Sequence, residues 1–408
     1  MAPAGARPSS EPIEASAQRG SSAITAEVEL VRSEKQPELR LRPLPVTPAR
    51  GPVEIDGSMG EGGGQVLRTS LTLAVLTGRA LRLENIRARR PKPGLMAQHL
   101  KAVEAAAAIS GARVEGAKLG SGALLFEPQE IRPGAYSFDI GTAGSTSLVL
   151  QTILLPLAFA PEASTVVVTG GTHVPWSPSF HYLDRQWVPY LRQIGFDPHL
   201  ELEQAGFYPR GGGRVKATVS PSSRRAPLRL LDRGALLRIR GISGVGKLDR
   251  AIAERQARRA TETLAVACKE IAIDVVEVPA ASPGTFLLLL AECEHSQACY
   301  CALGARGKRA ERVADEAAEG ILAFLAGDGA VDPWLADQLV LPLSITSGNS
   351  ELRTARVTGH LLTNAQVVKL FLPVRIEIAG ETGEPGTIRI AGLVSSAESE
   401  SARKASFP

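Results

Sequence analysis

This chain has little cysteine, few aromatic residues and no long apolar stretch, and each scarcity excludes a class of protein. Four cysteines in 408 residues are too few for a fold stapled by disulfides, and they fit a reducing compartment. With three Trp, five Tyr and ten Phe, recognition of nucleic acid dominated by base stacking is disfavoured. No apolar run approaches the roughly 20 residues of a membrane helix, and the first residues lack the charged-then-apolar order of a secretory signal. We therefore expect a cytoplasmic protein without a membrane partner.

The composition of the chain is otherwise that of an ordinary globular protein with two unusual ends. Hydrophobic residues make up 44% and charged residues 22%, and the length suffices for two or three domains. The first 50 residues hold seven of the 28 prolines and no aromatic residue. We expect residues 1–50 to form a flexible N-terminal extension, with at most one strand near 27–31, and residues 395–408 to form a flexible tail.

The body between these ends repeats itself with a period of about 80 residues. A glycine cluster opens an apolar helix at 65–76, and another opens a helix at 145–157. Apolar spacings of three and four predict further helices at 94–110 and 180–194, each followed by a glycine. Two strands come after each of these later helices. One unit therefore consists of helix, helix, strand and strand.

A third copy of this unit is interrupted. The sequence Leu-Pro-Leu at 155–157 recurs at 341–343, which is one period plus roughly 100 residues further on. The surplus residues contain strands and helices of their own, and insertion at an exposed turn is tolerated because domain termini often lie close together. We predict an α/β fold: a large domain from 51–234 and 331–394, with a smaller α/β domain inserted at 235–330.

The strongest local signal for chemistry is the segment 60–68, with the sequence GEGGGQVLR. Clustered glycines let backbone N–H groups approach a ligand, and the N-terminus of the following helix favours an anion. Glu61 stands where a carboxylate can hold a divalent cation against phosphates, and Arg68 lies one helical turn further on. The alternative is a tight turn with a solvent-exposed Glu, and the sequence leaves it open.

Positive charge is concentrated in one segment. Residues 79–101 carry seven basic residues against one acidic residue, although the net charge of the whole chain is only +4. Such a patch suits a polyphosphate or an RNA backbone. Prolines alternate with Arg90 and Lys92, so a stiff loop holds these charges in place. A solvated basic face is the alternative.

Two other segments imitate known sites. Residues 241–247 (GISGVGK) look like a phosphate-binding P-loop, but the next residue is Leu248, where a Ser or Thr would bind magnesium. Cys293, His295, Cys299 and Cys301 are residue types that bind zinc. The segment is explained more simply as a hairpin with buried thiols.

Histidines supply the candidate nucleophile. His99, His181 and His360 occupy related positions in the repeats, so at least one of them can be architectural. His360 differs because its neighbours in the segment 359–364 (GHLLTN) are small and polar at the start of a helix. Spacing alone does not establish a catalytic role for it.

Seven motifs, taken together and in order, resemble the RNA 3′-terminal phosphate cyclases. They are GEGGGQ at 60–65, RPKPGL at 90–95, QHL at 98–100, DIGTAGS at 139–145, GFYPRGGG at 206–213, ADQ at 336–338 and HLLTN at 360–364. The resemblance covers about residues 52–380. It implies three βαβαββ-type repeats, an architecture that enolpyruvate transferases share, with a smaller α/β insert in the third.

The resemblance also implies a reaction. A histidine attacks the α-phosphorus of ATP, releases pyrophosphate and becomes adenylylated, and AMP then passes to an RNA 3′-phosphate. The neighbouring ribose 2′-OH attacks that phosphate and expels AMP, which leaves a 2′,3′-cyclic phosphodiester. ATP is then the co-substrate, Mg²⁺ or Mn²⁺ the metal, and RNA with a 3′-phosphate end the partner. Neutral imidazole suits the first step, and cationic groups offset the phosphoryl charge.

Site residues follow from the matching motifs. The resemblance makes His360 the nucleophile and Glu61 the residue nearest the metal. Phosphate contacts fall to Arg68, Arg87, Arg90 and Lys92. The ATP-binding positions are Gln151, Trp334, Leu335, Ala336, Asp337 and Gln338. Trp334 departs from the family pattern, which often has Tyr or His there.

Three alternative functions remain at this point. A non-catalytic relative acting in ribosomal RNA processing would lack the nucleophile, whereas this chain has His360. An enolpyruvyl-type transferase with the same repeat would neither use ATP nor form a covalent nucleotide. A passive RNA-binding module explains the basic segment but gives no role to residues 336–338 or to His360.

Overall fold

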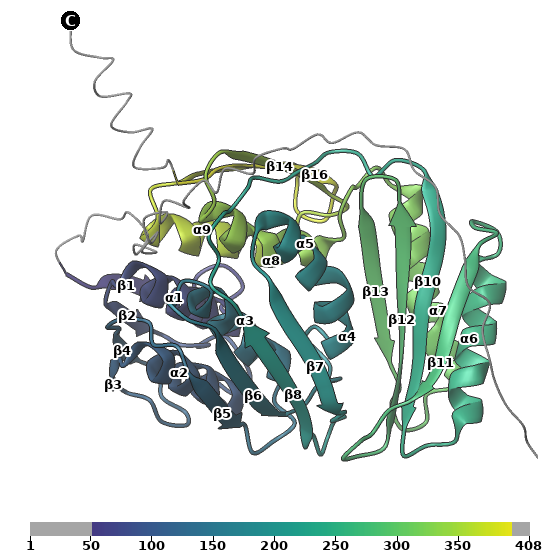
Figure 1. Cartoon of the computed structure of the whole chain (residues 1–408), viewed down its shortest axis with the longest axis horizontal. Helices are drawn as coiled ribbons and strands as arrows, with labels where there is room; N and C mark the ends of the chain where they lie inside the picture. Colours follow the sequence, from purple (N-terminus) through teal and green to yellow (C-terminus); the bar gives the residue numbers. More distant parts are fainter. Residues whose placement is uncertain (1–50, 394–408) are drawn as a thin grey trace, which may run out of the picture. The chain divides into compact units, whose positions relative to one another are not determined.

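The computed structural model describes residues 51–393, which form four small mixed sheets with helices packed on them (Figure 1). The predicted α/β class is confirmed. The expected extension at 1–50 and the expected tail at 395–408 lie outside the described residues.

The first sheet sets a pattern that recurs. Its elements are β1 (Val53–Asp56), α1 (Gly64–Thr77), β2 (Leu81–Glu84), α2 (Ala97–Ser110), β3 (Arg113–Glu115) and β4 (Leu124–Glu127). The strand order is β1-β2-β4-β3, with β1 and β2 parallel and the other neighbours antiparallel. Helix α1 connects the parallel pair, because parallel neighbours need a crossover.

Two further sheets have the same order and strand directions. The second comprises β5 (Ala135–Asp139), α3 (Thr146–Leu157), β6 (Ser164–Gly170), α4 (Phe180–Tyr182), the π-helical turn η1 (Leu183–Trp187), α5 (Val188–Ile194), β7 (Pro198–Gln204) and β8 (Gly213–Val219). The third comprises β9 (Arg229–Leu230), α8 (Pro333–Ser344), β14 (Asn349–Thr354), α9 (Gly359–Phe371), β15 (Arg375–Ala379) and β16 (Gly386–Ala391).

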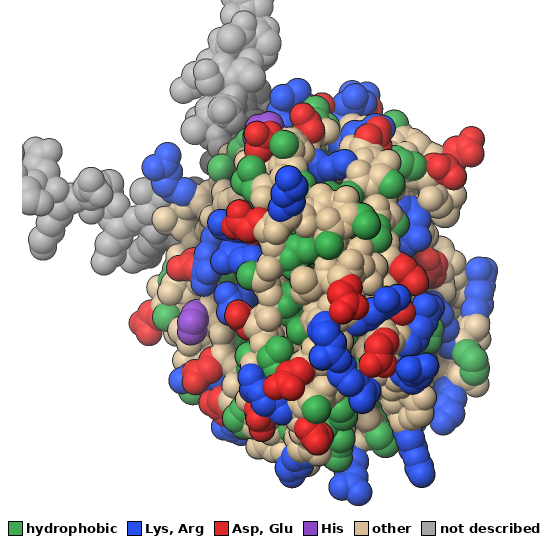
Figure 2. All heavy atoms as spheres, turned by 90° about the vertical axis from the view of Figure 1, so that its right-hand side faces the viewer, with side chains coloured by type: hydrophobic (Ala, Val, Ile, Leu, Met, Phe, Trp, Pro, Cys, Tyr) green, Lys and Arg blue, Asp and Glu red, His purple; other side chains and the backbone are tan. Residues whose placement is uncertain are grey.

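A fourth sheet stands in the chain between β9 and α8. Its elements are β10 (Leu236–Gly246), α6 (Arg250–Leu264), β11 (Ile271–Glu277), β12 (Gly284–Cys293), β13 (Gln297–Leu303) and α7 (Ala310–Ala326). The strand order is β11-β10-β12-β13. Figure 2 shows basic and acidic side chains interspersed on one face of the molecule, and ion pairs such as Arg259–Asp315 connect α6 and α7.

The cores follow this division. One large cluster of buried side chains joins the first three sheets and their helices, while Ile239, Leu287 and Ile321 belong to a separate cluster within the fourth sheet and its helices. Side chains along a strand point alternately to its two faces, so one face of each sheet packs into the core. In β6, buried residues alternate with half-buried ones. Small clusters connect the two cores, one of them around Phe207 and Phe286.

The two segments that resemble known sites, 241–247 and the cysteine-rich stretch 293–301, are ordinary parts of the inserted sheet. Most of the P-loop look-alike lies inside strand β10, and its Lys247 donates to the Ala281 carbonyl oxygen at 3.1 Å. The cysteine-rich segment is the antiparallel hairpin of β12 and β13, as predicted, and its three thiols are free, as is that of Cys268 after α6. Among the described residues there is neither a trio of His, Cys, Asp or Glu placed to hold a metal nor a helix long and apolar enough to cross a membrane.

Candidate active site

Loops that follow parallel strands carry several of the predicted site residues. Glu61 follows β1, Arg87 and Arg90 follow β2, and His360 follows β14. Ligands of open α/β sheets bind outside the carboxyl ends of such strands. Helix α9 packs against both α1 and α8, so residues far apart in the sequence come together here (Figure 1).

Glu61 and His360 are in direct contact. Glu61 Oε2 lies 2.9 Å from His360 Nε2, and both side chains are partly exposed. The Glu61 backbone N–H faces Thr363 Oγ1 at 3.4 Å, and Thr358 caps α9 by accepting from the Leu361 N–H. A carboxylate only accepts hydrogen bonds, so Nε2 of His360 carries the hydrogen in this pair, and in the neutral form of the ring the lone pair is on Nδ1.

The glycine turn closely approaches two nitrogen-bearing side chains. A Cβ atom on Gly64 would overlap the ring of His99 and lie 2.9 Å from Arg68 Nη1. His99 Nδ1 accepts the Met96 N–H at 3.2 Å, so the hydrogen is on Nε2, the ring atom nearest that Cβ position. Burial, with the charges of Arg68 and Arg87 nearby, lowers the pKa of His99 to about 3 and keeps the ring neutral. The turn therefore suits an anion.

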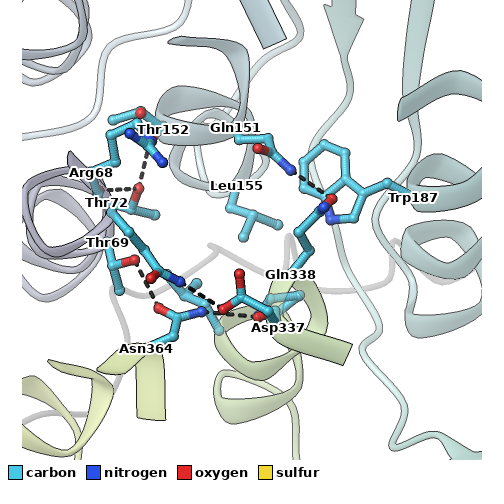
Figure 3. A pocket seen from close by; sticks show the side chains of 13 residues that line it. Arg68, Thr69, Thr72, Gln151, Thr152, Leu155, Trp187, Asp337, Gln338 and Asn364 are labelled. Atoms are coloured by element: carbon cyan, nitrogen blue, oxygen red, sulfur yellow. Dashed lines mark hydrogen bonds between the residues drawn. The ribbon is translucent and has the colours of Figure 1, made fainter. Parts of the chain in front are cut away.

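A polar pocket of about 80 Å³ lies next to this turn, between side chains of α1, α3, α8 and α9 (Figure 3). Gln65 Nε2 donates to Asp337 Oδ1 at 2.7 Å. Thr69 Oγ1 donates to Asn364 Oδ1 at 2.8 Å, and Asn364 Nδ2 donates to the Asp337 carbonyl oxygen at 2.9 Å. The Gln65 bond orients the pocket's one carboxylate, and the other two bonds hold Asn364 between α1 and the backbone of α8.

Arg68 and Asp337 are the charged groups of the pocket. Burial raises the pKa of Asp337 to about 6, although the charge of His360 and hydrogen bonds from Gln65 and Asn364 act in the opposite direction. Burial lowers the pKa of Arg68 to about 10, and the charge of Asp337 opposes this effect. Among residues 51–393, no acceptor is hydrogen-bonded to the Arg68 guanidinium. That cation is therefore available to an anionic ligand.

Helix α8 is held by the buried carboxylate of Asp332. Its Oδ1 accepts from the Trp334 and Leu335 N–H groups at 3.1 and 2.9 Å and from the Tyr182 hydroxyl at 2.8 Å. Its Oδ2 accepts from Gln186 Nε2 at 2.7 Å. The start of α8 is thus tied to the helices of the second sheet.

The consecutive residues predicted to bind ATP point in different directions. Trp334 is exposed and meets the Tyr300 ring edge-to-face, with centroids 5.3 Å apart. The side chains of Leu335 and Ala336 are buried in the core, which leaves only their backbone for a ligand. Asp337 and Gln338 line the pocket, as does Gln151, whose Nε2 donates to Gln338 Oε1 at 2.8 Å (Figure 3).

The basic loop after β2 reaches the glycine turn through Arg90. Arg90 Nη2 donates to the Glu61 carbonyl oxygen at 3.1 Å and lies 4.0 Å from the Glu61 carboxylate. Arg87 instead braces its own loop, donating to the Lys92 and Gly94 carbonyl oxygens at 2.7 and 2.8 Å. Burial, with the charge of Arg90, lowers the pKa of Arg87. The Lys92 side chain is exposed.

Sequence reasoning missed several polar residues of this site. Gln65 and Asn364 lie inside recognised motifs, but nothing local indicates that they bond to Asp337 and Thr69. Asp332 has a detectable signal, because Asp followed by Pro is a typical helix start. The burial of its carboxylate and its partners in η1 and α4 come from tertiary packing.

Comparison with known proteins gives a consistent family. The sequence model described as "RNA 3'-terminal phosphate cyclase" matches residues 59–378. Three similar proteins bear that same name: one from Ralstonia nicotianae (47% identity; 84% of this chain, 96% of its own length), one from Methylococcus capsulatus (46%; 83% and 96%) and one from Staphylothermus marinus (45%; 84% and 98%). Among solved structures, the enolpyruvyl transferase NikO from Streptomyces tendae aligns over 84% of this chain and 49% of its own, with TM-score 0.35 and 12% identity.

Proposed function

This chain belongs to the RNA 3′-terminal phosphate cyclase family, and from that premise we propose that it converts an RNA 3′-terminal phosphate to a 2′,3′-cyclic phosphodiester at the expense of ATP. The observation that carries the proposal is the contact between His360 and Glu61 beside a polar pocket. Asn364, one turn beyond His360 on α9, lines that pocket, so His360 stands on the same helix next to the space where we place the nucleotide.

The first step makes a covalent enzyme. A lone pair of His360 attacks the α-phosphorus of ATP, an N–P bond forms, and the bond to pyrophosphate breaks. While Nε2 carries the hydrogen that faces Glu61, the lone pair of the neutral ring is on Nδ1, so attack through Nε2 requires the other tautomer, in which the hydrogen is on Nδ1 and Nε2 no longer donates to Glu61. Arg68 and Arg90, with the N-terminus of α1, offset the charge on the phosphoryl oxygens.

The second and third steps use the RNA. An oxygen of its 3′-phosphate attacks the phosphorus of the His360 adduct, and the N–P bond breaks to return the imidazole. The adjacent ribose 2′-OH then attacks the activated 3′-phosphate, its proton passes to solvent or to a base, and AMP leaves. Because nucleophile and phosphate belong to one nucleotide, proximity supplies much of the rate in this last step.

The residues present fit a divalent cation that is shared with the nucleotide. Glu61 contributes one partly exposed carboxylate at the turn, and Asp337 is already bonded to Gln65. One or two carboxylates plus substrate phosphates and water are the typical ligands of Mg²⁺. Such a cation, when bound, neutralises phosphoryl charge.

The alternative functions explain fewer of these contacts. A passive RNA-binding module needs neither the pocket between four helices nor the carboxylate set against His360. A non-catalytic relative has no use for an accessible imidazole in that position. An enolpyruvyl transferase does not require a nucleophilic histidine facing a nucleotide pocket.

Labelling with nucleotide tests the proposal directly. Purified protein incubated with Mg²⁺ and ATP labelled at the α-phosphate is expected to retain acid-labile label, because a phosphorus–nitrogen bond is hydrolysed in acid. His360→Ala is expected to abolish the label. The matched control is His199→Ala, which removes an exposed histidine on β7. Label on His360→Ala at the wild-type level would assign the nucleophile elsewhere, and absence of label on the wild type would remove the proposed mechanism.

A further inference from the structure

Few aromatic side chains of the described chain are exposed, and two of them lie on neighbouring turns. Among the Trp, Tyr and Phe of residues 51–393, three are exposed: Trp176 (99%), Tyr208 (68%) and Trp334 (46%). Trp334 begins α8 beside the pocket. The other two sit on neighbouring turns of the second sheet.

The two turns lie side by side. Gly170 at the end of β6 pairs with Gly213 at the start of β8, which brings the turn 205–212 next to the loop 171–179. The Thr172 and His173 N–H groups both donate to the Gly206 carbonyl oxygen, at 2.9 and 3.2 Å. Trp176 and Tyr208 stand at the exposed tips of these two joined segments.

Both turns are rigid at their bases. In the first, residues 171–174 are buried and the Phe180 N–H donates to the Thr172 carbonyl oxygen at 2.9 Å. In the second, Ser282 accepts from the Phe207 N–H at 3.0 Å, and the Gly211 N–H closes the turn on the Phe207 carbonyl oxygen at 2.7 Å. Turns that are held at their bases keep the positions of Trp176 and Tyr208 in the chain fixed, so less conformational freedom of the backbone is lost when a ligand binds there.

A continuous series of contacts leads from these turns to the glycine turn. A Cβ on Gly211 would lie 2.7 Å from the Ala143 Cα atom, so the Tyr208 turn abuts the loop 140–145. In that loop, the Ser145 N–H donates to Gln98 Oε1 at 2.9 Å. Gln98 precedes His99, whose ring faces Gly64. Arg210, at the tip of the same turn as Tyr208, adds an exposed cation.

We propose that Trp176 and Tyr208 form a stacking surface for the unpaired bases of the RNA strand that precede its 3′-terminal phosphate. Exposed aromatic rings near cationic groups are the usual platform for single-stranded nucleic acid, since every base has a π-face. The basic loop and glycine turn then take the phosphate end, and the two rings take the bases upstream of it. The inference rests on the proposed function, because that function brings RNA to this face.

The test measures RNA binding in the absence of ATP, so that no chemistry occurs. The probe is a 5′-fluorescein-labelled adenosine hexaribonucleotide with a 3′-phosphate, followed by anisotropy. Trp176→Leu and Tyr208→Leu remove the aromatic ring and keep an apolar side chain, and each is expected to weaken binding roughly five- to tenfold. Trp176→Phe and Tyr208→Phe keep a ring and are expected to stay within about twofold of the wild type. Val266→Ala, which trims an exposed apolar residue after α6, is the control and should change nothing.

Labelling of His360 by ATP alone separates this inference from the proposed function. Leu variants that label like the wild type but bind the hexamer weakly support the stacking surface. Leu variants that bind the hexamer like the wild type overturn it. Leu variants that need more ATP for labelling also overturn it, because the rings would then contact the nucleotide. If the wild type takes no label while the Leu variants still bind RNA weakly, the proposed mechanism fails and the RNA surface stands.

Discussion

Two glycine-rich segments of this chain, 60–68 and 241–247, have similar composition and different structures. The first is a turn that opens α1, and it meets His99, Arg68 and Arg90. The second is largely a length of strand β10, paired on both sides with β11 and β12. Its glycines make room for neighbours inside the inserted sheet: a Cβ on Gly244 would overlap the buried Phe286 ring. Glycine clustering alone therefore does not indicate a phosphate site. What distinguishes such a site is a following helix start together with donors from other elements.

The sharpest test of this contrast adds one methyl group to each segment. Gly64→Ala places a Cβ into the buried His99 ring and against Arg68, so it is expected to lower the rate of ATP labelling about 100-fold and to lower the free energy of unfolding as well. Gly244→Ala overpacks the insert core and is expected to lower the free energy of unfolding by about 1–3 kcal/mol, while the folded protein still labels. Labelling rates and urea unfolding of both variants give the comparison. Equal labelling by Gly64→Ala and the wild type would contradict the role of the first segment.

Arg90→Lys keeps the charge near the first segment and removes its planar fork. Arg90 bonds to the Glu61 carbonyl oxygen beside the site, so we expect turnover of a short 3′-phosphorylated RNA to fall at least tenfold. The control is Arg89→Lys, an exposed neighbour on the same loop. Measurements at low and moderate salt separate the two possible roles, because long-range attraction is screened by salt and a close contact much less so. If Arg90→Lys and the wild type turn over the RNA equally fast at both salt concentrations, the loop is only a general RNA-attracting face.

The pH dependence of stability reports on the charged pocket beside the first segment. Burial raises the pKa of Asp337 to about 6, so between pH 4 and 6 the folded protein binds a proton that the unfolded chain does not. This stabilising contribution is fully present only below pH 4, where the carboxyl of the unfolded chain is protonated too, and about 2–3 kcal/mol of stability is lost as the pH rises through 6. Asp337→Asn is expected to remove that loss. Urea unfolding from pH 4 to 7.5 gives the free energy of unfolding of the wild type and of the variant, and the difference between the two pH profiles measures the contribution of Asp337. Parallel profiles would show that Asp337 titrates normally.

The smallest expected effect is that of Lys247→Ala in the second segment. Lys247 donates to the Ala281 carbonyl oxygen, and Leu248 offers no hydroxyl for magnesium. We expect the affinity for ATP to stay within about twofold of the wild type, measured by equilibrium binding. A tenfold loss of affinity, about 1.4 kcal/mol, would move the nucleotide site into the insert.

Local patterns in the sequence were enough to predict much of the fold. The helices predicted at 65–76 and 145–157 match α1 and α3 closely, because glycine starts and apolar spacing act within a few residues. The hairpin of β12 and β13 was predicted for the same reason. The argument against a P-loop at 241–247 also came from the sequence alone, because Leu248 lacks the hydroxyl that binds magnesium in such loops.

Contacts between distant residues were not predictable in this way. About 300 residues separate Glu61 from His360, and their pairing depends on how α9 packs on α1. No spacing indicates that Arg87 braces its own loop or that Leu335 and Ala336 turn into the core. The exposed position of Trp176 was equally hidden, because the count of aromatic residues says nothing of where the few lie.

The placement of the insert has a consequence for synthesis of the protein. Strand β9 pairs with β14, and about 120 residues separate them. At typical translation rates, on the order of ten seconds pass between the emergence of the two strands. The first two sheets are complete by then, whereas α8 and α9, which bring Asp337 and His360, leave the ribosome near the end. If the proposed mechanism holds, a nascent chain is unable to react covalently with ATP until the first two sheets and the insert have been made and His360 has followed them.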